Sequence, residues 1–424
     1  AVFLAGWGAG RLAGLLIPEA RVPGGLIAAT LAVWNPYVAE RLLQGHWSLL
    51  LGYGCLPWVA AAVIRLRTSV RGAHWAALVF WVTLAGFTPT GLILAVITAL
   101  TCVAVPGAGV SRMRCATASS AVAVLAASPW LVASGLGDAL DGPQSAGLAP
   151  FAARAEPGLG ALGSLAGLGG IWNADAVPHS RTTLFALVAT LVLLAVVAAG
   201  LPTAARRPQA VPLLVLAGVS VLVPAALATG PGLSLLRAGV DCVPGLAVLR
   251  DAQKWVGLAM PGYAVAGSGA VVALRRRCPA WASAAVCCVA LIAVLPDLAW
   301  GAWGKVTPVR YPAAWPAVAA AINADPQPVA VLPADSTRRF GWSGSAAVLD
   351  PLPRWVRAEV LSTGDLRVSG GTVAGEGAHA RVVQDLLLAG ADPDALRRAG
   401  VGWVVVEGGT PGATGDAERT LRQL

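Results

Sequence analysis

Three polar stretches interrupt an otherwise apolar chain, and the first of them spans residues 35–47. Because the residue before a proline is disfavoured in helical geometry, Asn35-Pro36 should end one helix, and residues 37–46 should form a short one. One face of that helix would carry, at i, i+4 and i+7 spacing, Tyr37, Arg41 and Gln44. The candidate sugar- or acceptor-binding residues of this stretch are Tyr37, Gln44 and His46. A polar turn that anchors the chain at a membrane surface fits the same pattern, so both interpretations stand.

The second polar stretch is a long connection, 134–182, that is rich in glycine and carries both acidic and basic residues. Its candidate sugar- or acceptor-binding residues are Trp172, Asn173 and Asp175. An indole beside amides and carboxylates suits a sugar, because the ring packs on C–H faces while the polar groups bind hydroxyls. An ordinary loop with scattered charges remains the alternative.

The third polar stretch, 248–255, lies directly before an apolar run, with Arg237 upstream. Charged and polar side chains at the start of a membrane helix are costly unless they are used or paired. The positive end of that helix, together with Arg250 and Lys254, predicts an anion site that suits a lipid phosphate, with Arg237 as a third member. A charged collar that merely anchors the helix is the alternative.

Composition places these stretches in a membrane protein. Hydrophobic residues make up 57% of the chain and charged residues 12%, with a mean hydropathy of +0.71. The net charge of +9 comes mainly from arginines beside apolar runs, which argues against a nucleic-acid partner. The seven cysteines show neither a disulfide framework nor metal-ligand spacing, so we expect no metal and no bound cofactor.

Ten apolar segments are candidate membrane spans, although about 20 residues are needed to cross a bilayer and several are shorter. They are 2–17, 24–34, 47–64, 75–87, 92–105, 117–133, 183–201, 211–228, 255–274 and 281–298. The short segments 24–34 and 75–87 are candidates for tilted or broken helices, or for parts of a re-entrant pair.

Arginines follow alternate segments, which predicts how the chain is threaded. They are Arg21, Arg65, Arg67, Arg71, Arg112, Arg114, Arg206, Arg207, Arg275, Arg276 and Arg277. Positive residues next to spans stay in the cytoplasm. The outer face then holds the loops near 35–46, 134–182 and 229–254, with everything after about 299. This pattern predicts a multi-pass protein of the inner (plasma) membrane with a polytopic region 1–299 and an extracytoplasmic domain 300–424.

The tail after about residue 305 alternates helical and strand patterns, as a small α/β domain does. We expect helices at 312–323, 378–389 and 393–399 and strands at 329–332 and 401–406. The tail carries no hydrolase or nucleotide-binding fingerprint, so we expect an accessory or binding domain. The sequence starts at Ala1 inside an apolar stretch, and we expect that further residues precede it.

The three polar stretches resemble those of actinobacterial GT-C glycosyltransferases, which take sugars from polyprenyl phosphates and include membrane arabinofuranosyltransferases. The similar pieces are Asn35-Pro36-Tyr37 with Gly45-His46-Trp47, Leu168-Gly169-Gly170-Ile171-Trp172, and Leu249-Arg250-Asp251-Ala252-Gln253-Lys254-Trp255. An outward α/β domain is also similar.

This resemblance implies an inverting transfer of a sugar from a polyprenyl-phosphate donor to an envelope glycan or lipid acceptor. The donor is a substrate rather than a cofactor, and membrane lipid is a further partner. The family's catalytic carboxylate lies in a first outer loop, which would precede Ala1, so the catalytic residue is unknown here. A non-catalytic GT-C-like scaffold, or a glycan- or lipid-binding subunit, is the alternative. A transporter would show inverted repeats and mid-bilayer charges, and neither is clear.

Overall fold

The computed structural model describes residues 1–69, 71–136, 148–243, 245–344, 346–368, 371–375 and 377–424. Residues 137–147 of the predicted loop 134–182 therefore lie outside the described residues. The chain divides into two compact units: Ala1–Gly137 with Phe151–Val306, and Asp138–Pro150 with Thr307–Leu424.

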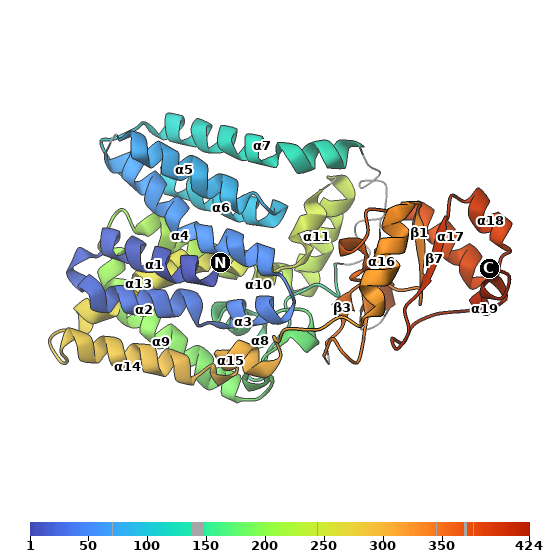
Figure 1. Cartoon of the computed structure of the whole chain (residues 1–424). Coiled ribbons are helices and arrows are strands. Elements are labelled where there is room, and N and C mark those ends of the chain that lie inside the picture. The colour runs from blue at the N-terminus through green and yellow to red at the C-terminus, as the bar shows by residue number, and fades with distance from the viewer. Residues whose placement is uncertain (70, 137–147, 244, 345, 369–370, 376) are drawn as a thin grey trace. The chain divides into compact units, whose positions relative to one another are not determined.

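The first unit is mostly helical (Figure 1). Its helices are α1 (Val2–Leu16), α2 (Arg21–Val33), α3 (Pro36–Leu43), α4 (Trp47–Thr68), α5 (Gly72–Ala85), α6 (Pro89–Val103), α7 (Arg112–Leu136), α8 (Gly160–Ala166), α9 (Phe185–Ala205), α10 (Val211–Leu227), α11 (Gly230–Cys242), α12 (Gln253–Val256), α13 (Ala259–Leu274), α14 (Ala280–Ala293) and α15 (Ala299–Gly304). Short 3-10 turns join some of them: η1 (Pro18–Ala20), η2 (Ala174–Ala176), η3 (His179–Thr182), η4 (Leu246–Arg250) and η5 (Pro296–Leu298).

Each of the ten predicted apolar segments falls on a helix, but ten spans are not confirmed. In the described part of the chain, four helices are long and apolar enough to cross a bilayer, or up to seven if each of three bent helix pairs counts as one span. The helices α5 and α6 have 14 and 15 residues. At 1.5 Å per residue they reach about 21–23 Å, which is less than the roughly 30 Å of a hydrocarbon core.

Two of the bent pairs involve segments that the sequence pattern treats as separate elements. The first joins α1 to the range Pro18–Leu43 with a bend of 113°, so the predicted spans 2–17 and 24–34 belong to one bent element. The second joins α10 to α11 with a bend of 93°. A bend of this size is compatible with a broken span or a re-entrant loop, as expected for segment 24–34.

Small residues let the helices at the centre of the first unit approach closely. The helix α13 packs against α9, α2 and α10, and α1 packs against α2 and α4 (Figure 1). At the α9–α13 contact, a Cβ atom placed on Gly200 would lie 1.9 Å from the carbonyl oxygen of Ala266. Close backbone contact at small residues is a main source of helix association in membranes, because burial of apolar side chains gains little there.

The arginine-bearing turns and the polar stretches lie at opposite ends of the helices that they share. The helix α2 begins at Arg21 and ends just before α3, which carries the first polar stretch. The helix α13 begins after the polar residues 251–254 and ends beside Arg275. The turns at the arginine end contact one another, since Arg207 pairs with Glu19. Arg67 donates from Nε to the carbonyl oxygen of Val105, at 3.1 Å. In these helices the arginines therefore lie at one end and the polar stretches at the other, as the alternating arginines in the sequence predict.

The second unit contains a three-stranded parallel sheet with β1 (Val329–Leu332) between β4 (Val360–Leu361) and β7 (Trp403–Val406). In register, Val329 lies beside Val360 on one side and Trp403 on the other. Its helices are α16 (Ala314–Ala324), α17 (Ala378–Leu388), α18 (Pro393–Arg398) and α19 (Ala417–Leu421). The predicted strands and helices of the tail are confirmed as elements.

The remaining strands form two antiparallel hairpins, β2 (Thr337–Arg338) with β3 (Val348–Leu349) and β5 (Leu366–Val368) with β6 (Gly371–Val373). Arg338 ties the first hairpin to the sheet, because it pairs with Asp350 after β3, at 3.1 Å, and with Glu407 after β7. Burial and the nearby Asp350 carboxylate raise the pKa of Glu407 to about 7, although Arg338 opposes the shift.

The α9–α13 contact predicts that Gly200→Val destabilises the protein by at least about 1–3 kcal/mol, the usual cost of overpacking. The new methyl groups would meet backbone atoms of α13 that cannot rotate away. The matched control is Gly218→Val on α10, where an added Cβ atom would meet no neighbouring atom within 4 Å. Denaturant unfolding in detergent measures both variants. Equal stabilities for the two would contradict the packing described here.

Candidate functional site

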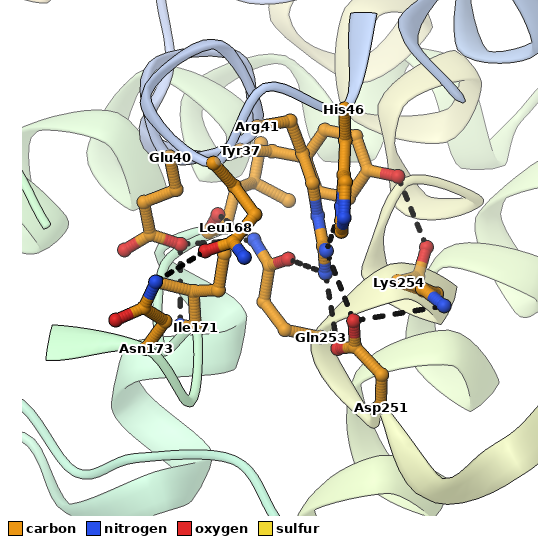
Figure 2. A network of polar contacts seen from close by, with 11 residues as sticks. Tyr37, Glu40, Arg41, His46, Leu168, Ile171, Asn173, Asp251, Gln253 and Lys254 are labelled. Carbon is orange, nitrogen blue, oxygen red and sulfur yellow. Dashed lines mark hydrogen bonds and ion pairs between the residues drawn. The ribbon is translucent and has the colours of Figure 1, made fainter. Parts of the chain in front are cut away.

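The three polar stretches meet in one network (Figure 2). Its members come from α3 and the residue that precedes α4, from the loop 168–173, and from the segment 251–254 at the start of α12. Segments more than 200 residues apart in the sequence are thus joined at one end of the helices.

Asn35 sets the start of α3. Its Oδ1 accepts the backbone N–H of Val38 at 3.0 Å, which caps the helix, and Pro36 occupies the first helical position, where no donor is needed. The Asn35 amide also donates to the carbonyl oxygen of Leu31, at 2.8 Å, and to the Tyr53 hydroxyl, at 3.1 Å. The predicted break at 35–36 and the short helix after it are confirmed.

A buried ion pair between Arg41 and Asp251 lies at the centre of the network. Arg41 donates from Nη1 and Nη2 to the two carboxylate oxygens of Asp251, each at 3.0 Å. Burial alone would raise the pKa of Asp251, but the Arg41 guanidinium outweighs it and lowers that pKa below its usual value. Arg41 also donates to the side-chain oxygen of Gln253. Because both terminal nitrogens of the planar Arg41 guanidinium are engaged, the Arg41 and Asp251 side chains have a fixed orientation relative to each other.

Gln253 connects this pair to Glu40 and to the loop 168–171. Its amide nitrogen donates to Glu40 Oε2 at 3.0 Å and to the carbonyl oxygen of Leu168 at 3.4 Å. The backbone N–H of Ile171 donates to the same Glu40 oxygen at 3.2 Å. The Glu40 carboxylate therefore holds both neighbouring stretches.

The glycines of the loop are required by its shape and by a second buried ion pair. Gly170 has a φ of +89°, and a Cβ atom on Gly169 would lie 2.7 Å from the Glu156 carboxylate. That carboxylate pairs with Arg181 through Nε, at 3.0 Å, and Nη2. Arg181 in turn donates to the Thr190 hydroxyl on α9, at 3.1 Å. The loop is thus fixed to a membrane helix as well as to α3.

The predicted sugar- and acceptor-binding residues divide into buried and accessible ones. Tyr37 is fully buried; it stacks on Tyr53 and donates its hydroxyl to the carbonyl oxygen of Lys254 at 3.1 Å. Gln44 accepts from the Asn173 amide at 2.7 Å, so these two residues join the first stretch to the second. His46 contacts Arg41 through Nδ1 at 3.0 Å.

Two further predicted residues lie at the edge of the network. The Trp172 ring packs edge-on against Phe151, with 4.6 Å between ring centroids, and is half-buried. Asp175 is exposed, and its backbone N–H donates to the Asn173 side chain at 3.0 Å.

Of the predicted phosphate-binding residues, two lie beside the network. The Lys254 ammonium is 3.9 Å from Asp251 Oδ2, and its side chain keeps 24% of its surface exposed. Arg250 lies over the ring of Phe151, at 4.6 Å from the centroid. Arg237 is exposed on α11, and no contact with Arg250 or Lys254 is described for it. A positive surface of Lys254 and Arg250 therefore borders a buried scaffold.

Sequence reasoning missed the scaffold itself: the roles of Glu40, Gln253, Glu156 and Arg181, and the partner of Asp251. The available signal was the cost of burying charges, which requires partners. The partner of Asp251 is 210 positions away, and no local spacing reveals it. Within the described ranges, no group of three or more histidine, cysteine, aspartate or glutamate residues has the arrangement of a metal site.

Two solved structures of the arabinofuranosyltransferase AftD from Mycobacteria have a similar fold. One aligns over 99% of this chain with a TM-score of 0.61 and 18% sequence identity. The other, of an AftD mutant, aligns over 97% with a TM-score of 0.55 and 19% identity. In both cases this chain covers 30% of the AftD chain. No family model and no curated protein matches the chain. At this identity the likeness establishes an AftD-like, GT-C-like fold.

Loss of one partner of the Arg41–Asp251 pair should destabilise the protein by about 3–5 kcal/mol, because the other charge stays buried and unpaired. Arg41→Met alone should show this loss, and Arg41→Met with Asp251→Asn should recover part of it. The exposed pair Arg422–Glu418 provides the control, and Arg422→Ala should cause no measurable loss. Denaturant unfolding of each variant in detergent is the measurement, and additive losses in the double variant would contradict the pairing.

The same pair has a defined pH dependence. Since the folded pKa of Asp251 lies below its usual value, its contribution to stability is complete above about pH 4, the unfolded pKa. It is lost as the pH falls through the lowered value.

Proposed function

We propose that this protein is a membrane glycosyltransferase. It would move a sugar from a polyprenyl-phosphate donor to a cell-envelope glycan or lipid acceptor on the outer face of the inner membrane. The observation that carries the proposal is the AftD-like fold over 99% of the chain. The meeting of all three polar stretches at one end of its helices supports it.

The charges around the network favour an anionic ligand. Asp251 is engaged by Arg41, and its nearest approach to Lys254 is 3.9 Å. Arg41, Lys254 and Arg250 are three cations against the two carboxylates Asp251 and Glu40, so these groups together favour an anion. A lipid phosphate that leaves the sugar gains negative charge, which cations placed beforehand stabilise. We assign this role to Lys254 and Arg250, with Arg237 as an outer member.

The residues proposed to bind the sugar or acceptor lie beside this positive surface. They are Gln44, Trp172, Asn173 and Asp175, with His46 between them and Lys254 and with Tyr37 as a buried support. The proposal assigns the catalytic base to no residue of this chain, because Asp251 and Glu156 are both held by arginines. Donor and acceptor act as substrates, and the proposal includes no cofactor.

A non-catalytic scaffold or glycan-binding subunit is the second candidate. It is favoured by the mutual pairing of Arg41 with Asp251 and of Arg181 with Glu156, and by the 30% of the AftD chain that this chain covers. Transfer of radiolabelled sugar from polyprenyl-phosphate donors to envelope glycan distinguishes the two. Transfer supports the enzyme, and donor binding without transfer supports the scaffold.

The phosphate assignment predicts that Arg250→Ala with Lys254→Ala weakens binding of a polyprenyl monophosphate at least tenfold, or about 1.4 kcal/mol. The control is Arg112→Ala with Arg114→Ala, which removes two exposed arginines from the opposite end of the helices. Isothermal titration in detergent measures both. Unchanged affinity in the first double variant would exclude the phosphate site.

The proposed sidedness predicts different labelling of two exposed native cysteines, Cys242 and Cys278. Each is kept alone while the other six of the seven cysteines are replaced by alanine. An impermeant maleimide should label Cys242 in intact spheroplasts and Cys278 only after permeabilisation. The opposite pattern would reverse the orientation and place the network in the cytoplasm.

A further inference from the structure

We infer that His46 is held as a neutral imidazole that donates its Nε2–H to a phosphate oxygen of the ligand. This role is distinct from that of an acid–base group. The inference rests on the proposed function for the nature of the ligand, whereas the tautomer of His46 is a separate claim about the chain itself.

The contact with Arg41 selects the tautomer. Arg41 Nη1 lies 3.0 Å from His46 Nδ1, and a guanidinium has donors but no acceptor. His46 Nδ1 must therefore accept with its lone pair, and the ring proton of the neutral imidazole resides on Nε2. Arg41 cannot turn away from this contact easily, because Asp251 holds both of its terminal nitrogens.

The charges that face His46 keep it neutral. They are Arg41 from α3, Asp251 from the segment before α12, and Lys254 from α12. Burial of the ring, followed by the positive charges of Arg41 and Lys254, lowers the pKa of His46 to about 4, although Asp251 opposes the shift. At neutral pH the imidazole is therefore uncharged.

The Nε2 atom remains available to a ligand. His46 is only partly buried, and the described part of the chain offers no hydrogen-bond partner to its Nε2. Its backbone is fixed, since the His46 N–H donates to the carbonyl oxygen of Arg41 at 2.9 Å. A fixed N–H donor beside Lys254 matches an anionic oxygen. With Nδ1 occupied and Nε2 protonated, the ring has no free site to accept a proton from a substrate hydroxyl.

Nitrogen NMR of the detergent-solubilised chain tests the tautomer directly, because the chain has only four histidines. His46→Asn identifies the His46 signal by its loss. If that variant fails to fold, His74→Gln, His179→Gln and His379→Gln identify it by elimination. The expected result is an Nε2–H tautomer that does not titrate between about pH 5.5 and 8. A pKa above 6, or a proton on Nδ1, overturns the inference.

A second measurement tests the ligand. Addition of a polyprenyl monophosphate should shift the His46 Nε2 signal, whereas a polyprenol without phosphate should not. An equal shift with polyprenol, or no shift with either, overturns the phosphate contact. A shift with inorganic phosphate supports it, and shows that the anion suffices without the lipid.

Affinity separates this role from the proposed function. His46→Phe removes the donor and should weaken binding of polyprenyl monophosphate about tenfold, and His46→Asn, which keeps an N–H donor, should stay within about threefold of the original protein. If His46→Phe binds normally while Arg250→Ala with Lys254→Ala does not, the donor role fails and the phosphate site stands. If neither variant weakens binding, both fail.

Discussion

Burial of a charge at the end of a membrane helix is costly, and in this protein that cost is met by pairing across the fold. Arg41 and Asp251 come from segments 210 positions apart. If either segment moves away, the charge on the other segment stays buried without its partner. Such a pair adds little net stability compared with apolar packing. Its effect is on arrangement, because it joins α3 to the segment 251–254 and, through Gln253, to the loop 168–171.

Local signals in the sequence predicted much of the fold. Asn35-Pro36 marked a helix boundary, and the alternating arginines marked which helix ends lie together. The strands at 329–332 and 401–406 followed from short apolar runs. The number of membrane spans could not be predicted from the sequence, because hydropathy gives the length of an apolar segment but does not show where a helix bends. The 113° bend after α1 coincides with the 3-10 turn Pro18–Ala20, a local feature that an apolar-length count passes over.

The candidate site was predicted in outline and not in its connections. Gln44, His46, Asn173 and Lys254 lie in or beside the network, whereas Tyr37, the first residue of the predicted face, is buried beneath it. The reason is that only one side of the short helix α3 is accessible. Which side that is depends on the residues that pack against the opposite side. Tyr53 and the backbone of Lys254 cover Tyr37 and thereby decide its role as support. The fold is similar to that of AftD, and the positive surface of Lys254 and Arg250 lies beside this support.

Arg338 in the second unit is shared by two carboxylates, and one of them, Glu407, ionises only near neutral pH. A buried carboxyl that prefers its proton in the folded state gives most stability below its ordinary pKa and loses that contribution as the pH rises through about 7. The Glu407 carboxyl therefore contributes most to the stability of this unit at acid pH, and ionisation of Glu407 at higher pH removes that contribution.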